Sequence, residues 1–196
     1  SVLGSGAWGT ALAQLISKKN NVLMWVKEKK VKIDINQNHS NKKFLPNIKL
    51  NKNIVGTDDL RDLRNSEIIF LTIPVQYMSS ILKKIKKIVN SDVIFVCCSK
   101  GIEMNSLKLP SQIVASYFPK NSIAVLSGPN FAEEISRNMP AATLIASSKI
   151  NISKKIASIV QTKLFRPYVS DDVMGSQIAG ATKNVYAIAC GVVEGK

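Results

Sequence analysis

Three glycines near the start of the chain constrain its fold more than any other feature. The sequence opens SVLGSGAWGTALAQLI, in which Gly4, Gly6 and Gly9 follow the pattern G-x-G-x-x-G. The apolar pair at 2–3 is typical of the end of a buried strand, and residues 10–17 carry apolar side chains at helical spacing. The opening therefore predicts a strand, a tight glycine turn and a helix, which is the context that gives this motif its meaning.

Each glycine of this motif has a separate physical purpose. Gly4 permits the tight turn, Gly6 lets the backbone approach a pyrophosphate, and Gly9 allows the helix to pack closely on the strand. The start of the helix then offers free N–H groups to the anion. Trp8, inside the turn, would either cover a cofactor or pack beneath it. A glycine-rich turn without a ligand is the alternative, whereas a Walker phosphate loop is excluded because G-x-x-x-x-G-K-[ST] is absent.

Predicted strands and helices alternate along the rest of the chain. This alternation indicates an α/β fold, with a Rossmann-like, mostly parallel sheet and helices on both faces. We interpret residues 39–57 as a loop and Thr57 as the N-cap of a short helix over 58–63. The predicted strands cover 20–26, 67–74, 92–98, 122–129, 141–147 and 166–172, and the predicted helices 27–38, 76–89, 106–118, 130–137 and 151–165.

The last segment of the chain differs from the rest. Residues 174–196 lack strand alternation and carry small side chains at close spacing, which indicates a buried helix, capped by Asp171 or Asp172. We expect residues 1–170 to form a dinucleotide-binding domain. We expect 171–196 to be the first helix of an all-α substrate and catalytic domain whose remainder is absent, so that the chain is truncated. The first strand likewise looks clipped at its start.

Composition narrows the classes of protein further. The net charge is +14, from 27 Lys and Arg against 13 Asp and Glu, which suits polyanionic partners such as phosphorylated small molecules, nucleic acid or acidic membranes. The lysines are spread over many segments, and aromatic RNA-binding signatures are absent, so we expect no nucleic-acid partner. No segment is long and apolar enough for a membrane span, and no signal peptide is evident.

Cysteine and histidine usage argues against a metal site. The chain has three cysteines and one histidine, with no C-x-x-C pair, so we predict that no metal is bound. Cys97 and Cys98 are adjacent in a predicted strand and should point to opposite faces of the sheet, while Cys190 lies far along the chain. Reduced thiols in a cytoplasmic protein are the simplest interpretation.

Polar residues at the ends of predicted strands are candidates for binding. The second strand is followed by Lys27 and Glu28, where a dinucleotide site contacts the adenosine ribose. Lys27 could pair with a 2′-phosphate, and Glu28 could still accept from ribose hydroxyls, so NADPH is favoured while NADH stays possible. Lys100 follows another strand, and Asn130 precedes a short helix that it could cap. Ordinary solvated lysines and a capped turn are the alternatives.

Lys183 and Asn184 lie in the middle of the terminal helix, among small and apolar residues. A lysine is costly to bury, and burial would make it a usable proton donor and acceptor. The alternative is a lysine at the edge of the helix that faces solvent.

Five segments together resemble a known family. GSGAWGTALA, NQNHSNKKFLP, SKGIE, SGPNFAEE and GATKNVYAIACG are similar, in order and spacing, to the bacterial type of NAD(P)-dependent glycerol-3-phosphate dehydrogenase. The resemblance covers essentially the whole chain. It implies a Rossmann-like domain followed by an all-α domain, with NADPH or NADH as cofactor. It also implies reversible reduction of dihydroxyacetone phosphate to sn-glycerol 3-phosphate, the backbone precursor of phospholipids.

The resemblance also implies roles for individual residues. Lys183 would be the catalytic lysine that passes a proton to or from the C2 oxygen of the substrate. By the same resemblance, the cofactor would contact Gly4, Gly6, Ala7, Trp8, Gly9, Lys27, Lys100 and Ala132, and the substrate Lys100, Gly128, Asn130, Lys183 and Asn184. The chain departs from the family pattern at Thr182, where an apolar residue is usual, and at Lys27, where Arg or His is frequent. The family's later substrate-binding motif would lie beyond Lys196.

Two other functions compete with this interpretation. Another two-domain dehydrogenase, of the β-hydroxyacid or 6-phosphogluconate type, would also pair a Rossmann domain with helices. A non-catalytic nucleotide-sensing or nucleic-acid-binding module would fit the positive charge, but it has no need of Lys183 on a packed helix. A homodimer is plausible for the family, although no residue here argues for it.

Overall fold

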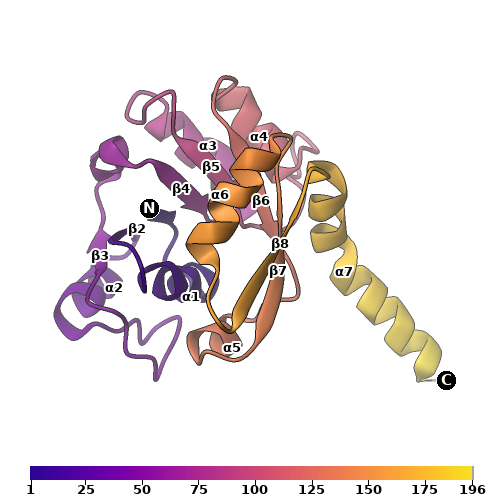
Figure 1. Ribbon diagram of the computed structural model, residues 1–196, viewed down its shortest axis with the longest axis horizontal. Coiled ribbons are helices and arrows are strands. Elements are labelled where there is room, and N and C mark those ends of the chain that lie inside the picture. Colours follow the sequence, from indigo (N-terminus) through magenta and orange to yellow (C-terminus); the bar gives the residue numbers. More distant parts are fainter. Residues whose placement is uncertain (196) are drawn as a thin grey trace.

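A computed structural model, which describes residues 1–195, contains one eight-stranded sheet (Figure 1). Its strand order is β3-β2-β1-β4-β5-β6-β7-β8. The first six strands are parallel, β7 runs antiparallel to β6, and β8 is parallel to β7. The strands are β1 Val2–Leu3, β2 Val22–Trp25, β3 Ile54–Thr57, β4 Ile68–Leu71, β5 Ile94–Cys97, β6 Ile123–Ser127, β7 Ala141–Ala146 and β8 Phe165–Ser170.

Helices cover both faces of this sheet, as the alternation predicts. One hydrophobic core packs α1 (Ala7–Ile16), α2 (Lys29–Ile33), α5 (Ala132–Ser136) and α6 (Ile150–Val160) against one face. A second core packs α3 (Val75–Ile85), α4 (Pro110–Tyr117) and the 3₁₀-helix Leu60–Asn65 against the other. The α/β fold, with a mostly parallel sheet between two helical layers, is confirmed.

The central strands are apolar because both of their faces are covered. All four residues of β5 are buried. Cys97 belongs to one core and the following Cys98 to the other, so the two thiols lie on opposite faces as predicted. Burial raises the pKa of Cys97 to about 12, and burial together with the neighbouring Cys97 raises the pKa of Cys98 as well. Both are therefore inert core side chains.

One strand and one cap differ from the prediction. Residues 54–57, predicted as the end of a loop, form the edge strand β3. Its apolar pair is too short to signal a strand, and Val55 is 52% exposed. Thr57 is not an N-cap: Asp59 caps the 3₁₀-helix Leu60–Asn65 by accepting from the backbone N–H of Arg61. The Thr57 hydroxyl is already engaged, since it bonds Asp62 and accepts from the N–H of Asp59.

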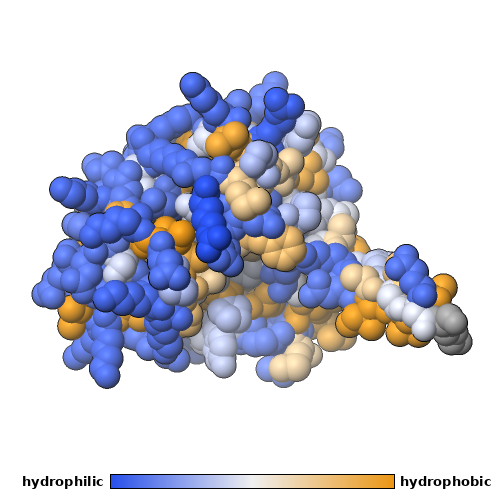
Figure 2. All heavy atoms as spheres, turned by 90° about the horizontal axis from the view of Figure 1, so that it is seen from below, coloured by the Kyte–Doolittle hydropathy of each residue, from blue (hydrophilic) through white to orange (hydrophobic). Residues whose placement is uncertain are grey.

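The terminal helix α7 (Val173–Glu194) forms as predicted, and Asp172 caps it by accepting from the N–H of Gly175 at 2.7 Å. The expectation that it is buried is wrong. Only Ser176 and Gln177 are buried, because the helix packs on the sheet and α4 through its first turns alone. Its second half projects from the body of the molecule (Figure 1), and apolar side chains lie exposed along that projection (Figure 2).

Candidate functional site

The glycine turn between β1 and α1 excludes side chains at two of its three glycines. Gly4 has φ +126°, and a β-carbon there would lie 2.8 Å from Thr72 Oγ1. A β-carbon at Gly9 would lie 2.1 Å from the carbonyl oxygen of Gly4. The backbone conformation and the close contact of helix and strand therefore require glycine at both positions.

Gly6 differs, because a β-carbon there would meet nothing within 4 Å. The residue has ordinary extended backbone, with φ −65° and ψ 177°, and it is the N-cap of α1 without a side-chain cap. The first amides of α1 thus open onto free space at the positive end of the helix. A diphosphate fits this position, and a side chain at residue 6 would compete with it.

Two polar side chains from elsewhere in the chain hold the turn in place. The hydroxyl of Thr72, which follows β4, bonds the carbonyl oxygens of Leu3 and Gly4, at 3.1 Å each. On the other side, the fully buried Asn41 donates from Nδ2 to the carbonyl oxygen of Ser5 at 2.9 Å and to Thr10 Oγ1 at 2.8 Å. Neither support is evident from the sequence pattern, although Asn41 lies within the segment NQNHSNKKFLP.

Replacing Asn41 by alanine should both destabilise the chain and weaken its binding of dinucleotides. The variant removes two hydrogen bonds and leaves the Ser5 carbonyl buried without this donor. We expect a loss of about 1–3 kcal/mol in the free energy of unfolding, measured by urea denaturation. A variant as stable as the wild type would show that Asn41 does not support the turn.

A cavity of about 340 Å³ lies beside the turn, at the carboxyl ends of β4, β5 and β6. Open α/β sheets bind their ligands at this edge. Trp8 lines the cavity and packs against the hydrophobic core. The cavity is lined by Trp8, Thr72, Ile73, Pro74, Cys98, Ser99, Lys100, Leu126, Gly128 and Asn130.

Lys100 lines this cavity. Its Nζ donates to the carbonyl oxygen of Gly128 at 2.7 Å. Partial burial of the ammonium, and then the positive charge of Lys183, lower the pKa of Lys100. The charges of two lysines from distant parts of the sequence therefore act on one another beside the cavity, which suits an anionic ligand.

Helix α7 packs against β6 and β7, and this contact places Lys183 near Lys100. A β-carbon at Gly180 would lie 2.9 Å from Ser127 Oγ and 3.5 Å from Lys100 Cγ. The absence of a side chain at Gly180 therefore allows the helix to approach Ser127 and Lys100 this closely. The Nζ of Lys183 then lies 5.5 Å from the centroid of the Phe131 ring. Lys183 is exposed, which corrects the expectation of burial in favour of the alternative that it faces solvent.

Asn130 does not cap the short helix α5, whose N-cap is Phe131. Its Nδ2 instead donates to the carbonyl oxygen of Ala142 at 2.7 Å. Its buried Oδ1 has no hydrogen-bond partner among residues 1–195. Since buried polar atoms are normally paired, this acceptor suits a ligand that donates a hydrogen bond.

The other residues predicted to bind the cofactor or the substrate do not line this cavity. Ala7 is the first residue of α1, and Ala132 is the first of α5. Asn184 is exposed on α7, with no hydrogen bond from its side chain within the part of the chain that the structure describes. Lys27 is exposed beyond β2, on the side of the glycine turn away from Lys100.

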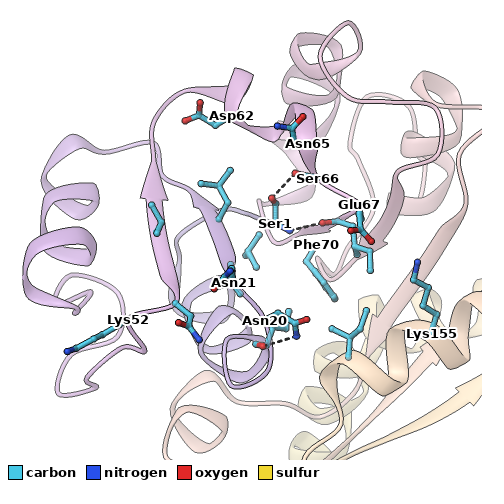
Figure 3. Close-up of a pocket in the computed structure, with 18 residues that line it drawn as sticks. Ser1, Asn20, Asn21, Lys52, Asp62, Asn65, Ser66, Glu67, Phe70 and Lys155 are labelled. Atoms are coloured by element: carbon cyan, nitrogen blue, oxygen red, sulfur yellow. Dashed lines mark hydrogen bonds between the residues drawn. The ribbon is translucent and has the colours of Figure 1, made fainter.

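A larger cavity, of about 690 Å³, lies at the opposite edge of the sheet (Figure 3). It is lined near the starts of β1, β2 and β4, with Asn20, Ser66 and Lys155 among its residues. No glycine motif, strand carboxyl end or unpaired buried polar atom is present there among residues 1–195. Size alone therefore does not make it the functional site.

Two further features bear on the type of protein. Across residues 1–195, His, Cys, Asp and Glu side chains nowhere gather in a group of three or more that could hold a metal ion. In the same range, no helix combines the length and the apolar character that crossing a bilayer requires.

Comparison with known sequences identifies the family. A family profile described as the N-terminus of NAD-dependent glycerol-3-phosphate dehydrogenase matches residues 1–153, well over half of the chain. This chain belongs to that family. The predicted resemblance is thereby confirmed.

Curated relatives and solved structures agree with this assignment. The chain is 43% identical to glycerol-3-phosphate dehydrogenase [NAD(P)+] of Zymomonas mobilis over 194 residues, which is 99% of this chain and 56% of that protein. It is 41% identical to the enzyme of the same description from Caulobacter vibrioides, covering 100% of this chain and 59% of the relative. The crystal structure of glycerol-3-phosphate dehydrogenase from Coxiella burnetii superposes with a TM-score of 0.91 at 29% identity, covering 99% of this chain and 60% of that one. The chain thus spans somewhat more than half the length of these proteins.

Proposed function

We propose that this chain is the dinucleotide-binding part of a glycerol-3-phosphate dehydrogenase that reduces dihydroxyacetone phosphate to sn-glycerol 3-phosphate, reversibly, with NADPH or NADH. In this role the protein supplies the backbone for phospholipid synthesis. The observation that carries the proposal is that Trp8 of the glycine turn and Lys100 line a single cavity, and that the helix bearing Lys183 passes against Lys100, in a chain of this family.

The glycine turn between β1 and α1 would hold the cofactor. The open space above Gly6 and the uncapped start of α1 favour a diphosphate there, with Ala7, Trp8 and Gly9 contributing the first amides of the helix. Lys27 would lie towards the adenosine ribose, and Lys100 and Ala132 towards the other end of the dinucleotide. When bound, the reduced nicotinamide supplies the hydride that the ketone carbon receives.

The substrate would lie beyond the cavity, between the two lysines. The ammonium groups of Lys100 and Lys183 attract a phosphorylated substrate, and Asn130 Oδ1 can accept from a hydroxyl of dihydroxyacetone phosphate. Gly128 and Asn184 complete the proposed substrate side. As negative charge develops on the C2 oxygen, Lys183 stabilises it and donates the proton.

The division of the chain into domains is part of this proposal. We assign residues 1–170 to the dinucleotide-binding domain and 171–196, of which Lys196 lies outside the described residues, to the first helix of an all-α domain. The exposed apolar side chains on the second half of α7, including Val185, Ile188 and Val192, support this division, because a helix domain would cover them.

The test is an assay of the full-length protein that contains this chain, following NADPH and NADH oxidation at 340 nm. Dihydroxyacetone phosphate should support oxidation, whereas 3-keto acids of the hydroxyacid-dehydrogenase class should not. Oxidation with those acids but not with dihydroxyacetone phosphate would favour the second family of dehydrogenases. Binding of DNA or RNA that NADPH does not displace would favour a nucleic-acid module.

A further inference from the structure

The residue that follows Lys27 is an acid at the position where dinucleotide sites contact the adenosine ribose. Leu3 of β1 pairs with Trp25 of β2, and the N–H of Gly4 donates to the carbonyl oxygen of Trp25 at 3.3 Å. The tip of β2 therefore adjoins the glycine turn. Glu28 comes three residues after Trp25, and a carboxylate there would accept from a 2′-hydroxyl and repel a 2′-phosphate.

The Glu28 carboxylate forms an ion pair with Lys43, which comes from a different segment. Lys43 Nζ lies 2.7 Å from both Glu28 oxygens. The same ammonium lies 5.1 Å from the centroid of the Phe44 ring, which packs against the hydrophobic core. Since Asn41 is fully buried and bonded to the glycine turn, Lys43 extends from a segment that is anchored on both sides.

The pair contributes little to folding, because both side chains are exposed, at 54% and 42%. Exposed ion pairs have small effects on stability. The effect on local charge is larger. Glu28 is the one acid in the run 27–33, whose other charged residues are Lys27, Lys29, Lys30 and Lys32. Lys43 neutralises this acid.

We propose that Lys43 is a specificity-determining residue that acts through Glu28 and favours a dinucleotide with a ribose 2′-phosphate over one with a free 2′-hydroxyl. By pairing with the Glu28 carboxylate, Lys43 cancels the repulsion between this carboxylate and a ribose 2′-phosphate. The same pairing makes the carboxylate less available to accept a hydrogen bond from a ribose 2′-hydroxyl. The inference rests on the proposed function, since it requires that a dinucleotide binds at the glycine turn.

The test compares dissociation constants of NADPH and NADH for the full-length protein, measured by fluorescence titration of bound reduced nicotinamide. Lys43→Met should weaken NADPH about fivefold and leave NADH unchanged or slightly tighter, because Glu28 is released. Lys52→Met is the matched control: it removes the same charge from a residue that lines the opposite cavity, and it should leave the ratio unchanged (Figure 3).

The variant Glu28→Gln shows whether Lys43 acts through Glu28. If it does, Lys43→Met should have less than a twofold effect on NADPH in the Glu28→Gln background. The same fivefold loss of NADPH affinity in both backgrounds would mean that Lys43 contacts the 2′-phosphate directly. An unchanged ratio of the NADPH and NADH dissociation constants in Lys43→Met would mean that Lys43 has no role in cofactor specificity. Either result overturns the proposal. A wild type that binds neither cofactor would overturn the proposed function itself, and this inference with it.

Discussion

Replacing Lys183 by alanine is expected to lower the turnover of dihydroxyacetone phosphate about 10²- to 10⁴-fold, the usual contribution of one well-placed proton donor. The dissociation constant of NADPH should change less than threefold. The reason is geometric: Lys183 lies near Lys100 and Phe131, on the proposed substrate side, whereas the glycine turn is the proposed site of the diphosphate. Steady-state kinetics and a fluorescence titration of the full-length protein provide the two measurements.

Two further variants make this prediction specific. Lys154→Ala removes an exposed lysine from α6, away from the cavity, and should retain full activity. Lys183→Arg keeps the positive charge but donates a proton poorly, so it should remain well below the wild type. Activity of Lys183→Ala within a factor of two of the wild type would contradict the catalytic assignment.

The second large effect is expected from Gly9→Ala. In an ordinary helix this change stabilises by about 1 kcal/mol, but here the new β-carbon would lie 2.1 Å from the carbonyl oxygen of Gly4. The clash is with backbone, which cannot rotate away. We expect a loss of about 3 kcal/mol or more in the free energy of unfolding, measured by urea denaturation, together with loss of dinucleotide binding.

Gly6→Ala is the matched control for this change, because it adds the same methyl group where nothing lies within 4 Å. Its stability should fall by no more than about 1 kcal/mol, since alanine is a poorer N-cap than glycine, while its affinity for NADPH falls about tenfold or more. If Gly9→Ala were as stable as Gly6→Ala, the close contact between α1 and β1 would be wrong.

Much of the fold follows from local patterns in the chain. The continuous apolar run around Phe70 predicts a central strand, since only a strand covered on both faces carries such a run. The glycine motif predicts the turn and the start of α1, because Gly4 needs positive φ and Gly9 a close approach. Asp172 was among the predicted caps of α7 because an acidic side chain can accept from the first amides of a helix.

The features that escaped prediction depend on contacts between distant residues. β3 is recognised only through its pairing with β2, since Val55 is exposed and its apolar pair is short. In the sequence Asn41 is an ordinary loop residue, and only the fold shows that its side chain donates to the carbonyl oxygen of Ser5. Asn130 precedes a helix as a cap would, but the neighbouring strand β7 offers its Ala142 carbonyl to the same amide.

The exposure of α7 was mispredicted for a related reason. Small and apolar residues such as Ala187 and Ile188 are typical of a packed helix, but packing requires a partner element. Within residues 1–195 the helix packs closely only along its first half, from Ser176 and Gln177 to Gly180. The pattern therefore predicted the character of the helix correctly and its surroundings incorrectly.

The most direct test of the account is an amide ¹H–¹⁵N NMR titration of the protein with NADPH. Binding at the glycine turn predicts the largest shift changes at the amides of Gly6, Ala7 and Trp8, with changes also at Lys100 and Gly128. Asn20, Asn65 and Ser66, which line the larger opposite cavity, should be unaffected. Shift changes centred on that cavity, or none at millimolar NADPH, would contradict the central claim.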